Sequence, residues 1–530
     1  YVATRFFLRY NEKNGGRKQM KILLTAINAK YIHSNLAVYN LRAYAAHYAK
    51  GMADSDTVEI GEYTINNQME DILEGIYKAK PDVLMFSCYI WNIAFVEELA
   101  EEFHKLRPEV PVWVGGPEVS YETESFLREH PQITGVMIGE GEKTFCELAE
   151  YYAGESRRDK EKQKIQETQR TGEGKSTEER SKPGEIPGIA YRNGDEIIFT
   201  APREMLDLSD IPFCYDKVEN FENRIIYYIY YESSRGCPFS CSYCLSSVEK
   251  QLRFRDAELV KKELQFFIDR EVPQVKFVDR TFNCNHAHAM EIWSYIKEHD
   301  NGITNFHFEI SADLLREEEL ALIGTMRPGL IQLEIGVQST NGATIKEIHR
   351  TMQLERLKEV VKEVQKHENI HEHLDLIAGL PFEDYDTFAK SFDEIYELRP
   401  NQLQLGFLKV LKGSYMYEHA KEYEIEYHSR PPYEVLKTKW LPYEDVLKIR
   451  QVEEMLEVYY NSGQFEITMK VLGVLFKSAF FMFQELGKYY ERNGYFGMSH
   501  ARIRRSEILL EFIKETFAGD ITAGEQRNIT

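Results

Sequence analysis

The sequence predicts an α/β protein of several domains, and three observations support this prediction. The chain has 530 residues, too many for one ordinary hydrophobic core, so we expect two to four domains. Apolar runs that suit buried strands alternate with amphipathic helical segments from Met20 to about residue 153, which is typical of a doubly wound parallel sheet. Beyond about residue 425 the apolar residues keep helical spacing and predict a mainly helical C-terminal domain.

Composition narrows the class of protein. The formal net charge of −21 argues against a nucleic acid as the main partner. No uninterrupted apolar run reaches the roughly 18 residues of a membrane helix. The longest candidate, residues 471–483, is interrupted by Lys477 and Ser478 and is predicted to be a buried helix. Seven cysteines in a chain of this length do not form a disulfide framework, so we expect a reducing, cytoplasmic location without a membrane span.

The predicted N-terminal sheet occupies residues 20–153 and follows a basic extension, residues 1–19, that is expected to be disordered. Its strands are expected at residues 21–27, 56–65, 82–90, 111–116 and 135–142. Ligands of such sheets bind outside the carboxyl ends of the strands. The candidate ligand-binding residues at these ends are Asn28, Ser34, Asn35, Ser87, Tyr89, Trp91, Gly115, Gly116, Glu118, Ser120, Gly139, Glu140 and Gly141. A flavodoxin-like scaffold whose glycines only form turns remains an alternative, and the lack of G-x-G-x-x-G before the first helix disfavours a dinucleotide site.

Two connecting segments follow. Residues 154–186 are highly charged and contain Ile165 as almost their only apolar side chain, so they are predicted to form a flexible linker. Residues 187–223 form a connector that begins with a hairpin turning at Asn193 and Gly194.

The most specific local pattern is "SSRGCPFSCSYC", in which Cys237, Cys241 and Cys244 have the spacing C-x3-C-x2-C. Zinc with a distant fourth ligand is one interpretation. An electron-transfer iron–sulfur cluster is another, although it needs four protein ligands. The third is a four-iron cluster whose fourth iron is left open to chelate the amine and carboxylate of a small molecule.

This spacing, with Tyr243 before the last cysteine, resembles the motif of the radical S-adenosylmethionine (SAM) family. Several later segments also resemble that family, especially the branch that includes oxygen-independent coproporphyrinogen oxidase. The resemblance implies a partial (β/α) barrel over residues 224–425, a 4Fe-4S cluster on the three cysteines, and bound SAM. The SAM-binding residues that it implies are Tyr243, Asp279, Thr281, Glu309, Gln338, Arg350 and Asp375.

Taken with the N-terminal α/β domain, residues 20–415 resemble radical SAM proteins that carry a cobalamin-binding domain. The resemblance implies cobalamin on the N-terminal strand ends, between the two domains. The D-x-H-x-x-G motif that supplies a histidine ligand is absent and His33 does not stand in its frame, so the cobalamin is expected to be base-off. Tyr89 or Trp91 could cover its lower face, with ordinary packing as the alternative.

The remaining conspicuous residues have simpler interpretations. The histidines of residues 286–289 and 367–373 are expected to be solvated, and Cys88, Cys146, Cys214 and Cys284 to be small buried hydrophobes. Cys284 follows a barrel strand and could face the substrate. Residues 426–530 are predicted to be a helical domain, and they resemble an uncharacterised tail found with some cobalamin-type radical SAM proteins.

Together these observations predict a cytoplasmic cobalamin-dependent radical SAM enzyme that methylates an unactivated carbon. A radical cyclase or rearrangement enzyme, in which cobalamin donates no methyl group, is the first alternative. A non-catalytic iron–sulfur or zinc protein is the second. The substrate, whether a small molecule or a peptide, is not identified, and an electron donor such as flavodoxin or ferredoxin is expected.

Overall fold

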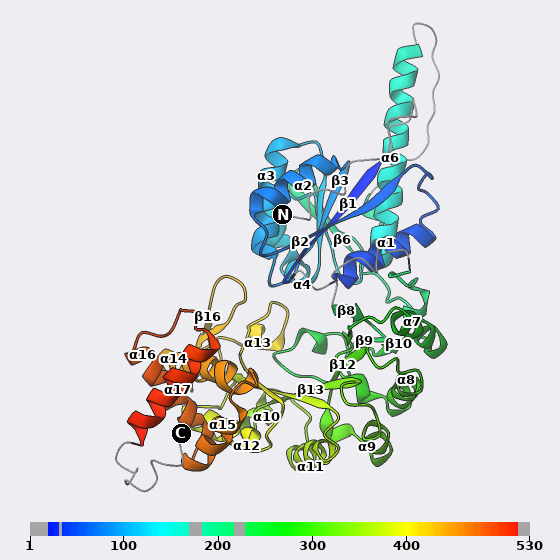
Figure 1. Ribbon diagram of the computed structural model, residues 1–530. Helices are drawn as coiled ribbons and strands as arrows, with labels where there is room; N and C mark the ends of the chain where they lie inside the picture. The colour runs from blue at the N-terminus through cyan, green and yellow to red at the C-terminus, as the bar shows by residue number, and fades with distance from the viewer. Residues whose placement is uncertain (1–19, 31–33, 169–182, 217–227, 518–530) are drawn as a thin grey trace. The chain divides into compact units, whose positions relative to one another are not determined.

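The computed structural model describes residues 20–30, 34–168, 183–216 and 228–517 (Figure 1). The predicted extension and His33 lie outside these ranges. The chain divides into two compact units, Tyr1–Ile226 and Tyr227–Thr530. None of the helices in the described ranges combines the length and hydrophobicity needed to cross a lipid bilayer.

The first unit is a seven-stranded sheet in the order β2-β1-β3-β4-β5-β6-β7. Strands β1 to β5 are parallel, and β6 and β7 add an antiparallel hairpin. The strands are β1 (Lys21–Asn28), β2 (Thr57–Thr64), β3 (Val83–Ser87), β4 (Val112–Gly115), β5 (Gly135–Met137), β6 (Ile189–Asn193) and β7 (Glu196–Phe199). The helices are α1 (Leu36–Tyr48), α2 (Met69–Ala79), α3 (Ile93–Leu106), α4 (Pro117–Ser120), α5 (Thr123–Glu129) and α6 (Glu142–Thr168).

Helices cover both faces of this sheet, which confirms the predicted doubly wound architecture. One hydrophobic cluster joins the sheet to α2, α3 and α5, through residues such as Ile76, Phe103 and Leu127. A second cluster joins the opposite face to α1 and α6, through Val38 and Phe145. The strands are apolar along most of their length because both of their faces are buried.

The predicted linker differs from the structure in its first half. Helix α6 continues to Thr168, and a 3-10 turn follows at Pro183–Glu185. Residues 155–168 contain no glycine or proline and are rich in Glu, Lys, Arg and Gln, which favour helix even without an apolar face. The sequence argument considered only the lack of buried surface and overlooked this local preference.

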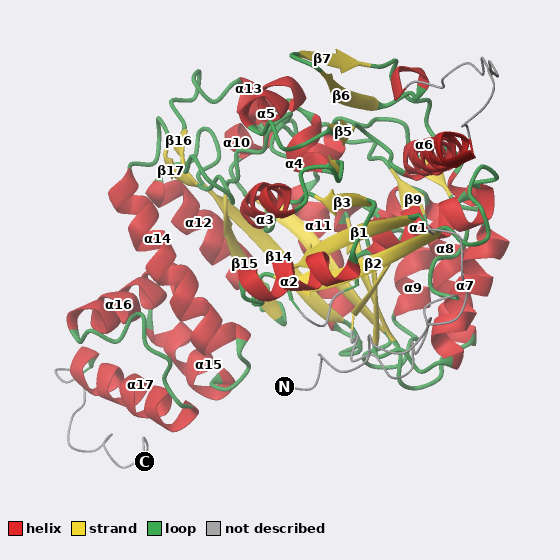
Figure 2. Ribbon diagram, turned by 90° about the horizontal axis from the view of Figure 1, so that it is seen from above, coloured by secondary structure: helices red, strands yellow, loops and turns green. Residues whose placement is uncertain are grey.

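The second unit contains six parallel strands in the order β15-β14-β13-β12-β11-β8. Helices connect successive strands, as in a partial (β/α) barrel (Figure 2). The strands are β8 (Tyr228–Tyr231), β11 (Gln274–Phe277), β12 (Asn305–Ile310), β13 (Ile331–Gln338), β14 (His371–Ala378) and β15 (Gln402–Phe407). The helices are α7 (Ala257–Asp269), α8 (His286–Glu298), α9 (Glu317–Ile323), α10 (Gly342–Glu347), α11 (Leu354–Gln365) and α12 (Tyr385–Tyr396).

Side chains alternate along these strands between an apolar face and a polar face. In β13, Leu333 and Ile335 are buried, whereas Glu334 between them is only half-buried on the opposite face. The apolar face packs against the helices; Phe308 of β12, for example, contacts Trp293 of α8 at a ring-centroid distance of 5.9 Å. The register places the polar side chains of adjacent strands side by side, so one face of the sheet collects ionisable groups.

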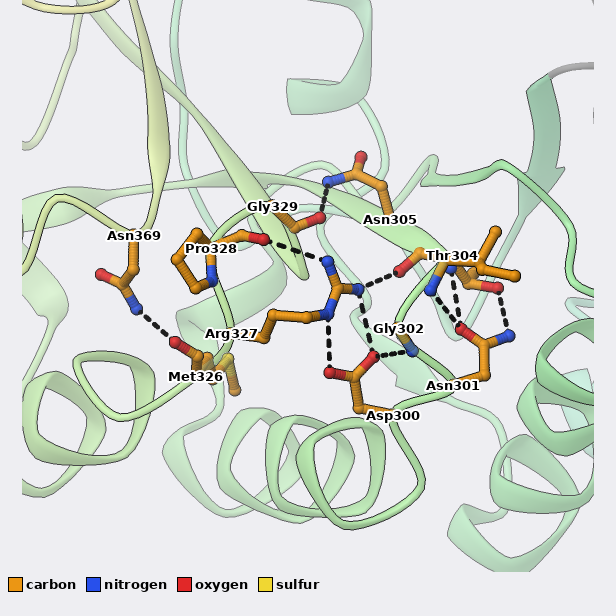
Figure 3. Close-up of polar contacts among 11 residues, drawn as sticks. Asp300, Asn301, Gly302, Thr304, Asn305, Met326, Arg327, Pro328, Gly329 and Asn369 are labelled. Atoms are coloured by element: carbon orange, nitrogen blue, oxygen red, sulfur yellow. Dashed lines mark hydrogen bonds and ion pairs between the residues drawn. The ribbon is translucent and has the colours of Figure 1, made fainter.

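The amino ends of β12, β13 and β14 are tied together by polar contacts between their loops (Figure 3). Arg327 donates to Asp300 at 2.8 and 3.1 Å and to the carbonyl of Thr304 at 3.3 Å. Asn369 donates to the carbonyl of Met326 at 3.0 Å. These contacts fix the ends of the strands that lie opposite the carboxyl ends, where ligands of parallel sheets bind.

The C-terminal region packs beside the barrel sheet and belongs to the same compact unit. Its helices are α14 (Tyr443–Leu456), α15 (Glu466–Leu475), α16 (Ala479–Arg492) and α17 (Arg502–Thr516), preceded by short strands β16 (Glu426–Tyr427) and β17 (Val435–Lys437). Asn461 accepts from the Leu403 amide at 3.0 Å and donates to its carbonyl at 2.8 Å. The C-terminal region therefore supplies hydrogen bonds to backbone groups of β15, which is an edge strand of the sheet.

The single buried helix predicted over residues 471–483 is wrong. Helix α15 ends at Leu475 and α16 begins at Ala479, with Ser478 capping α16 by accepting from the Phe481 amide at 3.1 Å. Val474 is 83% exposed. Serine competes for backbone hydrogen bonds and favours a helix start, which apolar periodicity does not register.

Glu372 is an acidic side chain on the apolar face of β14, and it generates a stability prediction. The residue is 0% exposed, and its carboxylate oxygens make no well-formed hydrogen bond. Burial raises the pKa of Glu372 to about 8, and the nearby Gln365 amide offsets only part of that effect. Because the folded pKa lies above the ordinary value of 4.5, Glu372 costs stability progressively as pH rises between these values.

We expect Glu372→Gln to be more stable than the wild type by an amount that is small at pH 5 and grows to about 2–4 kcal/mol by pH 8. Anaerobic thermal unfolding across this range measures the difference. Glu359→Gln, an exposed change on α11, should show no such growth. If the difference in unfolding free energy between Glu372→Gln and wild type stays constant with pH, the raised pKa of Glu372 is contradicted.

Candidate functional site

The three cysteines of the C-x3-C-x2-C motif lie on one loop between β9 (Ser234–Arg235) and β10 (Arg253–Phe254). Gly236 has φ +94°, and a Cβ there would lie 2.4 Å from the carbonyl oxygen of Gln251, so only glycine fits. The amide of Cys237 donates to the carbonyl of Glu249 at 3.0 Å. These contacts close the base of the loop and fix where Cys237 begins it.

The middle of the cysteine loop is fastened to the barrel. The amide of Ser242 donates to the carbonyl of Ile348 at 2.9 Å, and its carbonyl accepts from the amide of Met416 at 2.8 Å. A turn joins the Cys244 amide to the Cys241 carbonyl at 3.2 Å. Backbone contacts on both sides therefore hold the loop.

No two cysteines of the described residues form a disulfide bond, and Cys237, Cys241 and Cys244 are free thiols. Burial raises the pKa of Cys237, and the Phe239 amide and the Thr281 hydroxyl oppose this by hydrogen bonding to its sulfur. Thr281, predicted to contact SAM, thus lies beside the first cysteine. Among the described residues, no three His, Cys, Asp or Glu side chains gather around one point as they would for a single ion. The donor set of three free thiols on one anchored loop fits a cluster held by cysteine.

Arg350 connects the cysteine loop to the polar face of β13. One terminal nitrogen donates to the Tyr243 hydroxyl at 3.1 Å and lies 3.8 Å from the sulfur of Cys241, and the other donates to the carbonyl of Gly336. A guanidinium is always charged and presents several donors in a fixed fork. Arg350 therefore places a positive charge beside a thiol and orders the loop against the sheet. The structure brings together Tyr243, Arg350 and the loop, as the sequence predicted.

Gln338 ends β13 in an uncommon backbone conformation. Its φ is +73°, and a bulge separates it from Gly336. A Cβ on Gly336 would lie 2.4 Å from the side-chain nitrogen of Gln338, so the glycine makes room for this side chain. The side-chain oxygen of Gln338 is buried and has no hydrogen-bond partner in the structure. Such strain costs about 1–3 kcal/mol and clusters at ligand sites, so Gln338 is well suited to accept a hydrogen bond from a ligand.

Two predicted carboxylates, Glu309 on β12 and Asp375 on β14, lie on the polar face of this sheet, on either side of β13. Burial raises the pKa of Glu309 to about 7, and Arg280 and Lys276 lower it only in part. Burial also raises the pKa of Asp375, whose oxygen lies 3.1 Å from the Nε2 of His373. These carboxylates can accept hydrogen bonds from hydroxyl or ammonium groups of a polar ligand.

Asp279 differs from the other predicted SAM-binding residues. It is 0% exposed, and its carboxylate accepts from the amide of Ser233 at 2.9 Å, from the Ser233 hydroxyl at 2.8 Å and from the Ser234 hydroxyl. We therefore assign it to holding the strand that leads into the cysteine loop. The sequence shows an aspartate at a strand end, but not which way its side chain points.

Two histidines predicted to be solvated are buried. His288 is 8% exposed and its Nε2 lies 2.9 Å from the Ser233 hydroxyl, and His373 is 7% exposed beside Asp375. Both stand on the inward side of a regular element, which a cluster of histidine letters does not reveal. Cys88, Cys146 and Cys214 are buried as predicted, whereas Cys284 is partly exposed.

The sequence analysis also missed Lys276, His307 and Glu334 on the polar face. Lys276 lies 3.0 Å from Glu334, and the Nε2 of His307 lies 2.9 Å from the same carboxylate. The sequence pattern that indicates these residues is the alternation of polar and apolar residues in β11, β12 and β13. Period two places such residues on one face of a strand.

In the first unit, the carboxyl ends of β1 and β3 meet at a polar cluster. Asn35 caps α1 and donates to Asn28 at 3.2 Å and to Ser87 at 3.4 Å. Ser34 lies 3.0 Å from the hydroxyl of Tyr215, which comes from the connector. The structure thus brings together four of the predicted ligand-binding residues, and Tyr215 is an addition that sequence reasoning missed.

An aromatic pair stands at the same strand ends. The rings of Tyr89 and Trp91 are stacked, with centroids 4.5 Å apart and an interplanar angle of 4°. The indole of Trp91 donates to the carbonyl of Ile27 at 3.0 Å, and the residue is 41% exposed. The pair therefore presents a rigid, flat surface at the end of β1.

The other predicted residues of this unit lie in the loops after β4 and β5. Gly116 has φ +122°, and a Cβ there would lie 2.3 Å from the carbonyl oxygen of Cys88, so two strand-end loops approach closely. Ser120 donates to the Gly116 carbonyl at 2.8 Å, and Glu140 accepts from the Leu206 amide at 2.9 Å. These two side chains therefore support the loops. Glu118 is buried, and the remaining glycines line the ends of β4 and β5: Gly115, Gly139 and Gly141.

Comparison with known proteins finds family matches in three parts of the chain. Residues 22–149 match the B12 binding domain, residues 231–395 match the Radical SAM superfamily, and residues 421–525 match a protein family of unknown function (DUF4080).

The chain is 25% identical over 415 residues to 2-(S-pantetheinyl)-carbapenam-3-carboxylate methyltransferase of Streptantibioticus cattleyicolor, covering 72% of this chain and 53% of that protein. It is 26% identical over 360 residues to the cobalamin-dependent radical SAM methyltransferase TokK of Streptomyces tokunonensis, covering 62% and 46%. The chain thus spans about half the length of these curated relatives.

Among solved structures, the chain is similar in fold to the radical SAM methyltransferase TsrM of Kitasatospora setae, with a TM-score of 0.61 and 14% identity. That match covers 78% of this chain and 81% of TsrM. The chain therefore contains a B12-binding domain, a radical SAM domain after it, and then a region that matches a family of unknown function.

Proposed function

We propose that this protein is a cobalamin-dependent radical SAM enzyme that methylates an unactivated carbon of its substrate. The observation that carries the proposal is the anchored loop with three free thiols, set against a half-buried arginine and the unpartnered oxygen of Gln338. Two relatives named as methyltransferases and the B12-binding domain support the methyl-transfer part.

The thiolates of Cys237, Cys241 and Cys244 would hold a 4Fe-4S cluster, and Arg350 would balance part of the negative charge beside Cys241. Tyr243, Thr281, Glu309, Gln338, Arg350 and Asp375 would surround SAM at the carboxyl ends of the barrel strands. Asn28, Ser34, Asn35 and Ser87 would line the cobalamin site, with the stacked rings of Tyr89 and Trp91 covering the base-off face. When bound, the cluster supplies an electron for SAM cleavage and the corrin supplies a methyl group.

A chain of 530 residues with seven cysteines, three of them in one motif, suits a reducing cytoplasm as the working environment. Reduction of the cluster requires a one-electron donor, for which a flavodoxin or ferredoxin has suitable chemistry. The substrate would be a small molecule or a peptide. The polar face of the barrel sheet favours a substrate with hydrogen-bonding groups.

The first prediction concerns the cluster. Anaerobic reconstitution should give about four irons per chain and reductive cleavage of SAM. Alanine at Cys237, Cys241 or Cys244 should abolish both, because each thiolate binds one iron. Cys214→Ala, the same change at a buried cysteine of the other unit, should retain both. Stoichiometric zinc without iron in protein prepared without oxygen would rule out the cluster.

The second prediction concerns the corrin. Protein given hydroxocobalamin should retain about one equivalent, and electron paramagnetic resonance of its Co(II) form should lack nitrogen superhyperfine splitting. Trp91→Ala should weaken retention because it removes half of the stacked surface, whereas Tyr77→Ala, at an exposed aromatic residue of α2, should not. A nitrogen-coupled Co(II) spectrum would show that a base occupies the axial position.

The third prediction concerns the reaction. Methyl transfer consumes two SAM molecules per turnover, so S-adenosylhomocysteine and 5′-deoxyadenosine should form in roughly equal amounts with the true substrate. Gln338→Ala should weaken SAM binding about ten- to a hundredfold, the effect of losing a buried hydrogen bond of about 1–3 kcal/mol.

The matched control for Gln338→Ala is Gln332→Ala, on the same face of β13 and about 20 Å from the carboxyl end. It should leave SAM affinity unchanged. Equal affinity losses in both variants would show that Gln338 has no direct role. Substrate-dependent 5′-deoxyadenosine without S-adenosylhomocysteine or a methylated product would favour the cyclase or rearrangement alternative.

A further inference from the structure

Lys276 lies between two carboxylates on the polar face of the barrel sheet. Its ammonium nitrogen is 3.0 Å from Glu334 and 3.8 Å from Glu309. The three residues stand on adjacent strands, Lys276 on β11, Glu309 on β12 and Glu334 on β13, and Glu309 is the direct register partner of Glu334. Neighbouring carboxylates repel each other, so the lysine is the group that allows both to be charged at once.

The two carboxylates differ in the number of their ion-pair partners. Glu334 contacts both Lys276 and the Nε2 of His307, at 3.0 and 2.9 Å, and these partners lower its pKa to about 2. Among the described residues, the ion pair of Glu309 is with Lys276 alone, at the longer distance. Burial raises the pKa of Glu309 to about 7. The charge of Glu309 is therefore the more sensitive of the two to its ion pair with Lys276, for which Glu334 competes.

We propose that Lys276 is a positioning residue that keeps Glu309 charged and directed toward the SAM-binding end of the barrel, and that Glu334 competes for it. The inference rests on the proposed function, in which Glu309 binds SAM. It extends that function by assigning roles to Lys276 and Glu334.

The groups that act on Glu309 from every neighbouring element fix the direction of each expected effect. Lys276 and Arg280, on and after β11, favour its charged form. Glu334 on β13 and Asp375 on β14 disfavour it. On β8, Tyr230 is close enough to interact with Glu309.

Removing Lys276 therefore raises the pKa of Glu309, because Glu334 still repels its charged form and only Arg280 still favours that form. Removing the charge of Glu334 lowers that pKa, because Lys276 is freed and a repelling charge disappears.

The test measures SAM affinity between pH 6 and 9 by equilibrium dialysis of the anaerobically reconstituted protein loaded with hydroxocobalamin. Comparing variants with wild type at each pH cancels the titration of SAM itself. Lys276→Met should move the midpoint for tight binding up by about one pH unit, which weakens binding about fivefold at pH 7. Glu334→Gln should move the midpoint in the opposite direction, and Lys276→Arg, which keeps the charge, should stay near wild type.

Several readouts separate the outcomes. The electron paramagnetic resonance signal of the reduced cluster should be the same in all variants, which shows that the protein is folded and loaded. Glu309→Gln should bind SAM weakly at every pH in this range. Its affinity should show no midpoint, because the variant lacks the carboxyl group whose titration produces one. Suppose that Glu309→Gln loses SAM affinity. If Lys276→Met and Glu334→Gln then leave the midpoint unchanged, or both shift it in the same direction, the role of Lys276 is overturned. If Glu309→Gln binds normally, the assignment of Glu309 to SAM is overturned and the inference falls with it.

Discussion

The alternation of side chains along the six parallel strands is the constraint on which the second unit depends. Apolar residues at every second position, such as Leu333 and Ile335, pack against helices and exclude water. The intervening positions must then face the opposite side, where no helix covers them. In a closed barrel that side is filled by branched apolar residues. Here it carries lysine, histidine and glutamate, whose burial is costly unless they are paired or bind a ligand.

The candidate site is built where this alternation is interrupted. The bulge before Gln338 and its positive φ move the end of β13 out of the regular pattern, and Gly336 provides the room. Arg350 uses that same room to reach the Gly336 carbonyl while contacting the cysteine loop through Tyr243. A substitution at Gly336 would therefore disturb the loop and the strand end together.

The B12-binding unit has no polar sheet face, because its strands are buried on both faces. Its polar groups are therefore confined to the strand ends. Asparagine and serine side chains satisfy one another there, and the stacked pair of Tyr89 and Trp91 is fixed by one indole hydrogen bond. Interlocked polar groups hold a preformed surface at little entropic cost on binding. The long helix α6 shows how strongly local preference acts, since it continues to Thr168 through a highly charged sequence with almost no apolar residue.

The fold class, the two-sided sheet of the first unit and the cysteine loop could be predicted from the sequence, because period and spacing are local properties of the chain. It also indicated Tyr243, Gln338 and Arg350, since the motifs carrying them are short. The tertiary structure was needed to show that Asp279 faces inward and that Lys276 is shared between Glu309 and Glu334. These facts depend on which strands are neighbours and in what register they pair. The residues in these contacts are about 30 to 60 positions apart and meet only when the sheet forms, and no local pattern records that distance.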